Sequence, residues 1–361
     1  MGNYTPVWAL GLMSGTSMDG IDAAIVQTDG CKVVATGPAV TLAYDNSLRN
    51  AICDATGKTN VKAPLIDELT DAHVSVVNEI FAQHPEYREK VKVIGLHGHT
   101  MLHAPQDRIT LQIGDGERLA RAVGIDVVYD FRSADVARGG QGAPLAPLYH
   151  CAIFRDLNRP IAVINIGGIS NITWIGDDDG TSPIAFDTGP GNALLDDWVQ
   201  DKTGDLLDRD GQISASGLAD DTIVEKLMRH PYFDKSPPKS LDRHDFSLLP
   251  FQSLSPRDGA ATLVRFTCRS ILSGLDHVPQ LPKRLLITGG GRRNPTIMGN
   301  LSHISAVPVD PVETVGWNGD SMEAQAFAFL AVRSLRGLPL SIPSTTGVPS
   351  PTKGGILSKA R

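Results

Sequence analysis

The sequence has few cysteines, no long apolar run and no excess of positive charge. Its four cysteines (Cys31, Cys53, Cys151 and Cys268) lie far apart and form no CxxC pair. This spacing argues against a disulfide framework or a zinc ribbon and is typical of a reducing compartment. The 33 basic and 40 acidic side chains give a net charge of −7, which excludes a dominant nucleic-acid surface. Because no segment is long and apolar enough to cross a membrane and the first residues do not resemble a signal peptide, we expect a cytoplasmic protein without a membrane span.

The 361 residues, 41% of them hydrophobic and 20% charged, are typical of a globular protein of two domains. Several glycine clusters follow short apolar, β-branched runs, which predicts buried strands at 7–10, 161–164, 184–186 and 285–287. Apolar spacing and capping residues predict helices at 64–83, 117–123, 192–203, 259–275 and 321–336. Strands that alternate with helices favour an α/β architecture. The stretch 338–361 is predicted to be a loop with little regular structure.

Two segments share one outline. Residues 10–26 and 163–175 each read as an apolar strand, a glycine turn and a second apolar strand. Two such hairpins, one in each half of the chain, suggest a duplicated domain with a ligand held between the halves. The likeness is one of pattern and not of identity, so duplication stays one of two interpretations at this point.

The first hairpin carries the groups that bind phosphate. Gly15, Thr16, Ser17 and Gly20 offer backbone N–H groups that form an anion nest, and the hydroxyl groups add donors. The nearby aspartates would repel a phosphate unless a divalent cation lies between, and Mg²⁺ bound by carboxylate, water and phosphate oxygens fits that role. The motif is not a Walker A loop, because no GK[ST] follows. A tight polar hairpin turn is the alternative.

A second candidate site is the segment 187–192. Asp187 is predicted to end a strand, and Asn192 to begin a helix. A carboxylate at a strand end in an open α/β sheet faces the ligand crevice and can take a proton from a hydroxyl group or water. The N–H groups around Gly189, Gly191 and Asn192 form a possible anion site. The alternative is that Asp187 only caps the turn.

Three further segments carry polar or glycine motifs. The triple glycine at 289–291, with Arg292 or Arg293 nearby, would suit a flat adenine or ribose, although a simple turn explains it equally well. His97, His99 and His103 are predicted to lie in a loop that contacts a sugar, because Gly98 and Pro105 imply a loop and no HExxH or adjacent cysteine supports zinc. Arg132 could fork onto a substrate carboxylate or pair internally with an aspartate. Residues 138–144 are interpreted as a flexible interdomain loop, and Glu323, in the first turn of its helix, could face the cleft.

Five motifs in order, GLMSGTSMDGIDAAIV, DFRSADVARGGQGAPL, INIGGISNIT, FDTGPGNALLDDW and LLITGGGRRNPTIM, resemble the anhydro-N-acetylmuramic acid kinase family from about residue 10 to residue 335. The resemblance implies a two-domain duplicated α/β fold of the actin-like, sugar-kinase (ribonuclease H-like) type, with ATP in an interdomain cleft. Its expected domains are 1–137, possibly joined by 338–361, and 138–337. It also implies a homodimer.

The resemblance further implies a reaction and the residues that perform it. ATP phosphorylates O6 of 1,6-anhydro-N-acetylmuramic acid while water opens the anhydro ring, which gives N-acetylmuramic acid 6-phosphate for cell-wall recycling. Asp187 is the implied general base, Asp19 the Mg²⁺ ligand, and His97, His99, Arg132 and Glu323 the sugar contacts. The implied ATP contacts are Gly15, Thr16, Ser17, Met18, Asp19, Gly20, Ile21 and Asp22 in the first hairpin, Gly167 and Gly168 in the second, Gly189, Gly191 and Asn192 after Asp187, and Gly289, Gly290 and Gly291 in the adenosine loop.

Two positions depart from the family pattern. His99 stands where the family usually has Gln, and Thr188 stands where Cys is frequent. If position 99 touches the sugar, substrate preference could differ. A kinase for another amino sugar on the same fold, or a nucleotide-binding switch without enzymatic activity, are the alternative functions.

Overall fold

The computed structural model describes residues 4–15, 18, 20–176, 182–242 and 245–360. The chain forms two compact units, the first made of residues 1–155 and 321–361 and the second of residues 156–320. The first unit therefore includes 138–155 and 321–337, which the sequence predicts to belong to the second domain. The difference arises because a C-terminal helix, α11 (Met322–Leu335), packs against the first sheet.

The first unit contains a mixed sheet in the order β12-β6-β4-β1-β2-β3, with β5 paired to β4. β2 is antiparallel to β1 and to β3, whereas β4 is parallel to β1 and β6 is parallel to β4. The strands are β1 (Val7–Ser14), β2 (Gly20–Thr28), β3 (Val33–Ala43), β4 (Val91–Ala104), β5 (Ile109–Ile113), β6 (Val127–Tyr129) and β12 (Ile356–Ser358).

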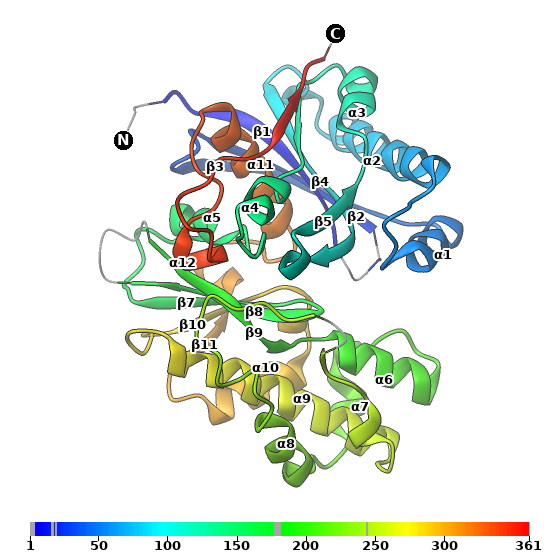
Figure 1. The fold of residues 1–361 in the computed structure, drawn as a ribbon, viewed down its shortest axis with the longest axis vertical. Helices are drawn as coiled ribbons and strands as arrows, with labels where there is room; N and C mark the ends of the chain where they lie inside the picture. The colour runs from blue at the N-terminus through cyan, green and yellow to red at the C-terminus, as the bar shows by residue number, and fades with distance from the viewer. Residues whose placement is uncertain (1–3, 16–17, 19, 177–181, 243–244, 361) are drawn as a thin grey trace. The chain divides into compact units, whose positions relative to one another are not determined.

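Helices cover the two faces of this sheet (Figure 1). Leu10 and Leu12 share a core with Val76 and Ile80 of α2, whereas Gly11, which points the other way, lies against α11. A Cβ atom at Gly11 would lie 1.7 Å from the carbonyl oxygen of Ala324, so the close approach of α11 requires glycine. The helices are α1 (Asn46–Ala55), α2 (Ala63–Gln83), α3 (Gly116–Val123), α4 (Ser133–Ala137), α5 (Pro147–Ile153), α11 and α12 (Pro343–Thr346).

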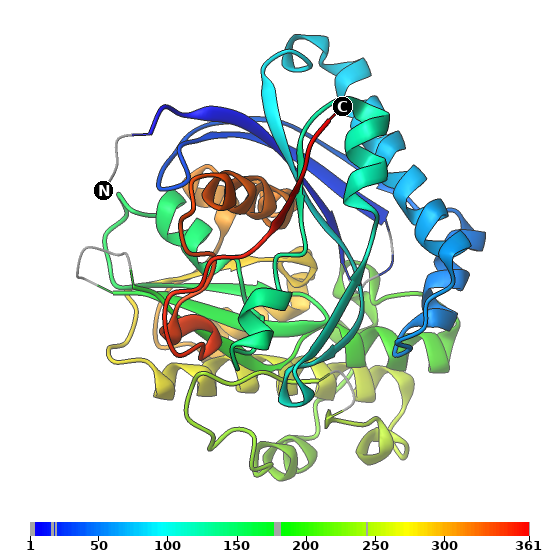
Figure 2. The same ribbon diagram turned by 45° about the horizontal axis from the view of Figure 1, so that its top comes forward.

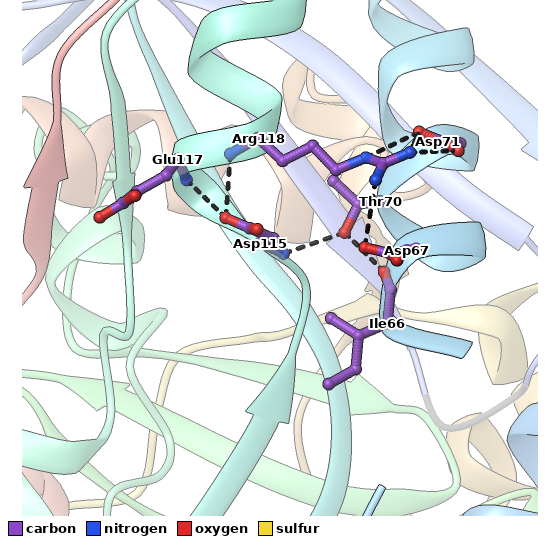
Figure 3. A network of polar contacts seen from close by, with 7 residues as sticks. All are labelled: Ile66, Asp67, Thr70, Asp71, Asp115, Glu117 and Arg118. Atoms are coloured by element: carbon purple, nitrogen blue, oxygen red, sulfur yellow. Dashed lines mark hydrogen bonds and ion pairs between the residues drawn. The ribbon is translucent and has the colours of Figure 1, made fainter. Parts of the chain in front are cut away.

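A polar network ties α3 to α2 at the surface of the first unit (Figure 3). Asp115 caps α3 by accepting from the N–H groups of residues 117 and 118, and its own N–H donates to Thr70 Oγ1 at 3.0 Å. Arg118 pairs with Asp71 at 2.7 Å and with Asp67 at 3.1 Å. Because these ion pairs are exposed, they fix the helix position more than they add stability.

The second unit contains a sheet in the order β11-β10-β7-β8-β9. Its strands are β7 (Ile161–Ile166), β8 (Ile169–Ile175), β9 (Ile184–Pro190), β10 (Leu285–Thr288) and β11 (Val309–Pro311). The core joins Ile164 and Phe186 of the sheet to Trp198 of α6 and Phe266 of α9. The helices are α6 (Ala193–Thr203), α7 (Gln212–Ala215), α8 (Asp221–Met228), α9 (Pro256–Ser273) and α10 (Pro295–Ile304).

The two sheets repeat one topology. In each, a three-stranded antiparallel meander (β1-β2-β3 or β7-β8-β9) is followed by two strands parallel to its first strand (β4 and β6, or β10 and β11). The predicted duplicated α/β fold is therefore confirmed.

The C-terminal stretch differs in part from the predicted loop. It belongs to the first unit, where Ile356–Ser358 adds the edge strand β12 antiparallel to β6. Figure 2 shows this segment in red beside the orange-brown helix α11. Among the described residues, the helices are all too short or too polar to cross a membrane.

Candidate active site

The carboxyl ends of parallel strands gather the candidate residues within each unit. β1 ends at Ser14 and β6 at Tyr129, and both run parallel to β4, so the segments after them emerge at one edge of the first sheet. In the second unit β7 ends at Ile166 and β10 at Thr288, again side by side and parallel. Open α/β sheets bind ligands at this edge.

The first hairpin turns tightly between β1 and β2. Met18 has a φ of 54°, and its N–H donates to the Gly15 carbonyl at 3.1 Å. Gly20 begins β2 with no room for a side chain, since a Cβ atom there would lie 2.4 Å from the Leu42 carbonyl oxygen. The predicted contacts Thr16, Ser17 and Asp19 lie outside the described residues. The described residues of this hairpin therefore include one turn hydrogen bond and a glycine that the neighbouring strand requires.

Buried side chains hold the start of this hairpin. Ser14 Oγ lies 2.7 Å from His99 Nδ1 and 2.5 Å from the Tyr44 hydroxyl group. His99 is fully buried, and burial lowers its pKa to about 4, so the ring is neutral at neutral pH. Its Nε2 has no hydrogen-bond partner among the described residues. His99 therefore supports Ser14 from inside the protein.

Asp22 and Ile21 follow the turn. Ile21 is fully buried, so neither its side chain nor its backbone is exposed in this structure. Asp22 Oδ1 accepts a hydrogen bond from Thr41 Oγ1 at 2.5 Å. Among the described residues no three His, Cys, Asp or Glu side chains are grouped to hold a metal ion. Magnesium bound to a nucleotide needs only one or two protein carboxylates, and Asp22 is the aspartate of this hairpin that the structure describes.

The histidines at 97 and 99 lie in strand β4 and not in the predicted loop. Gly98 between them has a φ of 72°, and a Cβ atom there would lie 2.2 Å from the Ile113 carbonyl oxygen. The glycine thus serves the close pairing of β4 with β5 and does not end the strand. His103, also in β4, lies 2.8 Å from the carbonyl oxygen of Gln141 through Nε2.

His97 orients Arg132. His97 Nδ1 lies 2.8 Å from the Gly98 carbonyl oxygen, so Nε2 is the acceptor, and Arg132 Nε and Nη2 approach it at 3.1 and 3.0 Å. Burial, together with the charge of Arg132, holds the pKa of His97 well below its usual range. Arg132 Nη1 also donates to the Gly142 carbonyl at 2.7 Å. A neutral imidazole and a loop carbonyl therefore fix the guanidinium plane.

In the second unit the hairpin tip is held by backbone. The carbonyl of Gly167 accepts from the N–H of Asn192 at 2.7 Å, and that of Gly168 accepts from the N–H of Gly191 at 2.9 Å. The predicted anion site at the start of α6 is wrong to this extent, because these two amides are already bonded to protein. Gly167 itself is partly exposed, and a Cβ atom there would make only ordinary contacts, the nearest at 3.5 Å.

The triple glycine meets the same hairpin. A Cβ atom at Gly289, whose φ is 76°, would lie 2.3 Å from Asn165 Oδ1, and one at Gly291 would lie 2.3 Å from Ile166 Cγ2. Gly290 is exposed, and its nearest neighbour would be Asn192 Nδ2 at 3.6 Å. Gly289 and Gly291 thus pack closely against β7, whereas Gly290 between them is accessible. A flat ring could lie on the exposed backbone of Gly290.

The arginines after the glycines have structural partners. Arg292 is almost buried and pairs with Glu313 at 2.9 Å and Asp320 at 2.8 Å, while its Nη1 donates to the Gly289 carbonyl. Arg293 also pairs with Asp320. Arg292 thus fixes the glycine segment from behind.

Asp187 lies inside β9, opposite Asn171, and not at the strand end that was predicted. Its carboxylate is half-buried, and Oδ2 accepts from the N–H of Leu241 at 2.9 Å. Its N–H donates to the Lys239 carbonyl, and its own carbonyl accepts from the Tyr232 hydroxyl group at 2.5 Å. The carboxylate is thus held in one orientation while part of the residue stays accessible. Thr188 beside it points inward and donates to the Ser170 carbonyl.

Sequence reasoning missed the segment 232–241 that supports Asp187. Lys239 is buried, its Nζ donates to the carbonyls of Tyr232 and Phe233 at 3.2 Å, and burial lowers its pKa to about 8. No glycine cluster or apolar periodicity marks these residues, so no local signal could have revealed them. Glu323, by contrast, lies exposed in the first turn of α11 as predicted.

Comparison with known proteins identifies relatives along almost the whole chain. The family model described as anhydro-N-acetylmuramic acid kinase matches residues 7–359. A protein of that name from Rhodospirillum rubrum is 53% identical over 97% of this chain and 93% of its own length. Another from Paramagnetospirillum magneticum is 51% identical over 96% of this chain and 98% of its own. A solved structure, (R)-2-hydroxyglutaryl-CoA dehydratase component A from Acidaminococcus fermentans, matches 91% of this chain and 99% of that chain with a TM-score of 0.48 and 14% identity, too low to support a conclusion.

Proposed function

Because the chain belongs to the anhydro-N-acetylmuramic acid kinase family, we propose that it uses ATP to phosphorylate O6 of 1,6-anhydro-N-acetylmuramic acid and that water opens the anhydro bridge in the same reaction. The water oxygen bonds to C1 as the C1–O6 bond breaks. The released O6 bonds to the γ-phosphorus as the bond to ADP breaks. The products are N-acetylmuramic acid 6-phosphate and ADP.

Asp187 is the proposed general base, and its carboxylate is the observation that carries the proposal. A base must be fixed in direction and must reach the attacking water. The hydrogen bond from Leu241 N–H to Oδ2 fixes the direction of the carboxylate. Because the side chain is only half-buried, water can reach it. The proton lost by water passes to this carboxylate.

The glycine segments are the proposed ATP contacts. Gly15 to Asp22 and the tip at Gly167 and Gly168 would bind the phosphates, and Gly289 to Gly291 the adenosine. The accessible backbone at Gly167 and Gly290 supports this, because a ligand can approach it closely. Asp19, with Asp22 nearby, would hold Mg²⁺, which neutralises charge on the phosphates during transfer.

Arg132 and Glu323 are the proposed sugar contacts. The substrate carries a lactyl carboxylate, and a guanidinium held flat by His97 and the Gly142 carbonyl is suited to bind it with two parallel hydrogen bonds. We assign His97 to the support of Arg132, and His99 to the support of Ser14. The cytoplasmic location and the homodimer stay predictions.

Product analysis tests the proposal. Protein, ATP, Mg²⁺ and the anhydro sugar should give the 6-phosphate, and Asp187→Asn should reduce kcat by about a thousandfold or more while ATP still binds. Asp54→Asn, which changes an exposed aspartate on α1, is the matched control and should keep full activity.

Two results would contradict this assignment. Unfolding of the Asp187→Asn protein would make the residue structural. Turnover of a free amino sugar, with none of the anhydro sugar, would favour a kinase of different specificity on the same fold.

A further inference from the structure

The loop 138–144 was interpreted as a flexible interdomain connection, yet it folds within the first unit around a buried carboxylate. Asp135 is 2% exposed, and its Oδ1 accepts a hydrogen bond from the N–H of Gly142 at an N···O distance of 2.6 Å. A Cβ atom at Gly140 would lie only 2.1 Å from the same oxygen. Gly142 has a φ of 67°. Gly140 is therefore required by the close fit around Asp135 and Gly142 by its backbone conformation, and the proposed reaction does not explain this fit.

The other carboxylate oxygen binds the C-terminal segment. Asp135 Oδ2 accepts from Ser341 Oγ and from Thr346 Oγ1, the latter at 2.6 Å. The N–H of Gln141 also donates to the Thr346 carbonyl at 2.6 Å. The Asp135 side chain thus hydrogen-bonds to residues that lie more than 200 positions away in the chain.

Among the residues that the structure describes, all the hydrogen-bond donors to this carboxylate are neutral. They are one backbone amide and two hydroxyl groups. Burying a carboxylate without a cation is costly, and the hydrogen bonds must offset that cost. Apolar residues could fill the same space without the cost, so the feature that Asp135 supplies is a fixed geometry.

That geometry leads directly to Arg132. The peptide unit of Gly142 bonds on one side to Asp135 through its N–H and, through its carbonyl, to Arg132 Nη1 at 2.7 Å. The rest of the guanidinium is fixed by His97. If the loop moves, Arg132 loses one of these two supports.

We propose that Ser341 and Thr346 are positioning residues that act through Asp135 and the Gly142 peptide to hold Arg132 for the carboxylate of the sugar. This inference rests on the proposed function, in which Arg132 binds the lactyl carboxylate. The C-terminal segment thereby sets the affinity and the selectivity for acidic over neutral anhydro sugars. ATP binding is independent of it.

The test removes the hydroxyl groups and leaves the carboxylate in place. Thr346→Val is nearly isosteric, Ser341→Ala is small, and the two are combined. The expected result is a rise of about tenfold in KM for the anhydro-muramic substrate, with KM for ATP within about twofold of the wild-type value. The kcat/KM ratio of that substrate to 1,6-anhydro-N-acetylglucosamine, which lacks the lactyl carboxylate, should fall by a similar factor.

Two controls separate positioning from general damage. Thr346→Ser keeps the hydroxyl group, so its KM for the anhydro-muramic substrate and its kcat/KM ratio between the two sugars should equal those of the wild-type protein. Ser75→Ala removes a hydroxyl group that bonds only within its own helix, to the Asp71 carbonyl, and should change neither. An unchanged sugar KM and selectivity in the double variant would overturn the inference. So would equal losses for ATP and both sugars.

A second readout needs no turnover. Amide hydrogen exchange at Gln141 and Gly142 should become faster in Thr346→Val and normal in Thr346→Ser. If the wild-type protein does not phosphorylate the anhydro sugar, the proposed function fails, and exchange still decides whether the hydroxyl groups hold the loop. Unchanged exchange would overturn the inference in either case.

Discussion

The two units build the same hairpin at the same place in the same five-strand order but support it by different means. In the first unit, side chains hold the hairpin, because Tyr44 and His99 both hydrogen-bond to the hydroxyl group of Ser14. In the second, backbone holds it, since amides at the start of α6 bond to the Gly167 and Gly168 carbonyls. The comparison teaches that the first hairpin is sensitive to side-chain chemistry and pH, and the second to a Cβ atom added at Gly191, where the backbone of α6 meets it.

The largest effect should come from Gly191→Ala. The new Cβ atom would lie 2.2 Å from the Gly167 carbonyl oxygen and would force the hairpin away from α6. We expect a loss of about 3 kcal/mol in the free energy of unfolding. ATP affinity should fall with it, and denaturant titration and calorimetry measure the two effects.

Gly299→Ala is the matched control. It lies in α10 with nothing within 4 Å of the added atom. It should raise the free energy of unfolding by up to about 1 kcal/mol through helix propensity. Equal stability of the two variants would show that the backbone contacts at Gly191 are unimportant.

Acid should destabilise the first unit. His73 and His99 have their pKa lowered to about 4, and His150 to about 3, in each case by burial. The unfolded chain takes up these protons near pH 6.5, and the folded chain only near pH 4 for His73 and His99 and near pH 3 for His150. Stability is therefore complete above pH 6.5 and declines as the pH falls toward 4, by up to about 3 kcal/mol for each histidine.

Hydrogen exchange at a series of pH values, corrected for the intrinsic rate, measures this difference. Opening of β4 and α2 should become easier below pH 6, whereas β7 and α9 should change less. Equal acid sensitivity of both units would remove the distinction between them.

His99→Gln tests the side-chain support more gently. An amide can hydrogen-bond to Ser14 but does not titrate, so we expect a two- to fivefold change in KM for ATP, with a flatter acid limb in the pH profile. His99→Leu, which cannot bond to Ser14, should be clearly worse. If His99→Leu matched the wild-type protein, the support of Ser14 would be dispensable.

The smallest effect should come from the surface network of α2 and α3 (Figure 3). Arg118→Lys replaces a forked contact to Asp71 by a single charge at an exposed position. The thermal midpoint should fall by no more than about 2 °C, and by less at high salt. A larger shift in a thermal melt would mean that the network limits the stability of the first unit.

Local patterns predict the elements and the positions of the glycine turns. The helix predicted at 64–83 is α2, and the one at 117–123 is α3, which ends at Gly124 in a left-handed conformation. The helix predicted from 259 begins at Pro256, because Ser255 caps it and proline fits its first position. Here the capping signal was present in the sequence and was missed.

Long-range contacts explain what local patterns could not predict. By local rules Gly98 favours a loop. In the structure its positive φ occurs within β4, where the strand pairs with β5. From the sequence alone, the amides of Gly191 and Asn192 are compatible with an anion site. In the structure they donate instead to the carbonyls of the hairpin at 167–168. Two of the three partners of the Asp135 carboxylate lie 206 and 211 positions away, so local patterns could not predict its role.

Isotope labelling of the solvent tests the central claim most directly. The reaction is run in H₂¹⁸O with ATP and the anhydro sugar, and the product is trapped by prompt reduction so that C1 cannot exchange its oxygen. The account predicts one ¹⁸O atom at C1, none in the 6-phosphate, and loss of both labelling and phosphorylation in Asp187→Asn. Label in free phosphate without opening of the sugar, or an unlabelled C1 in a phosphorylated product, would contradict it.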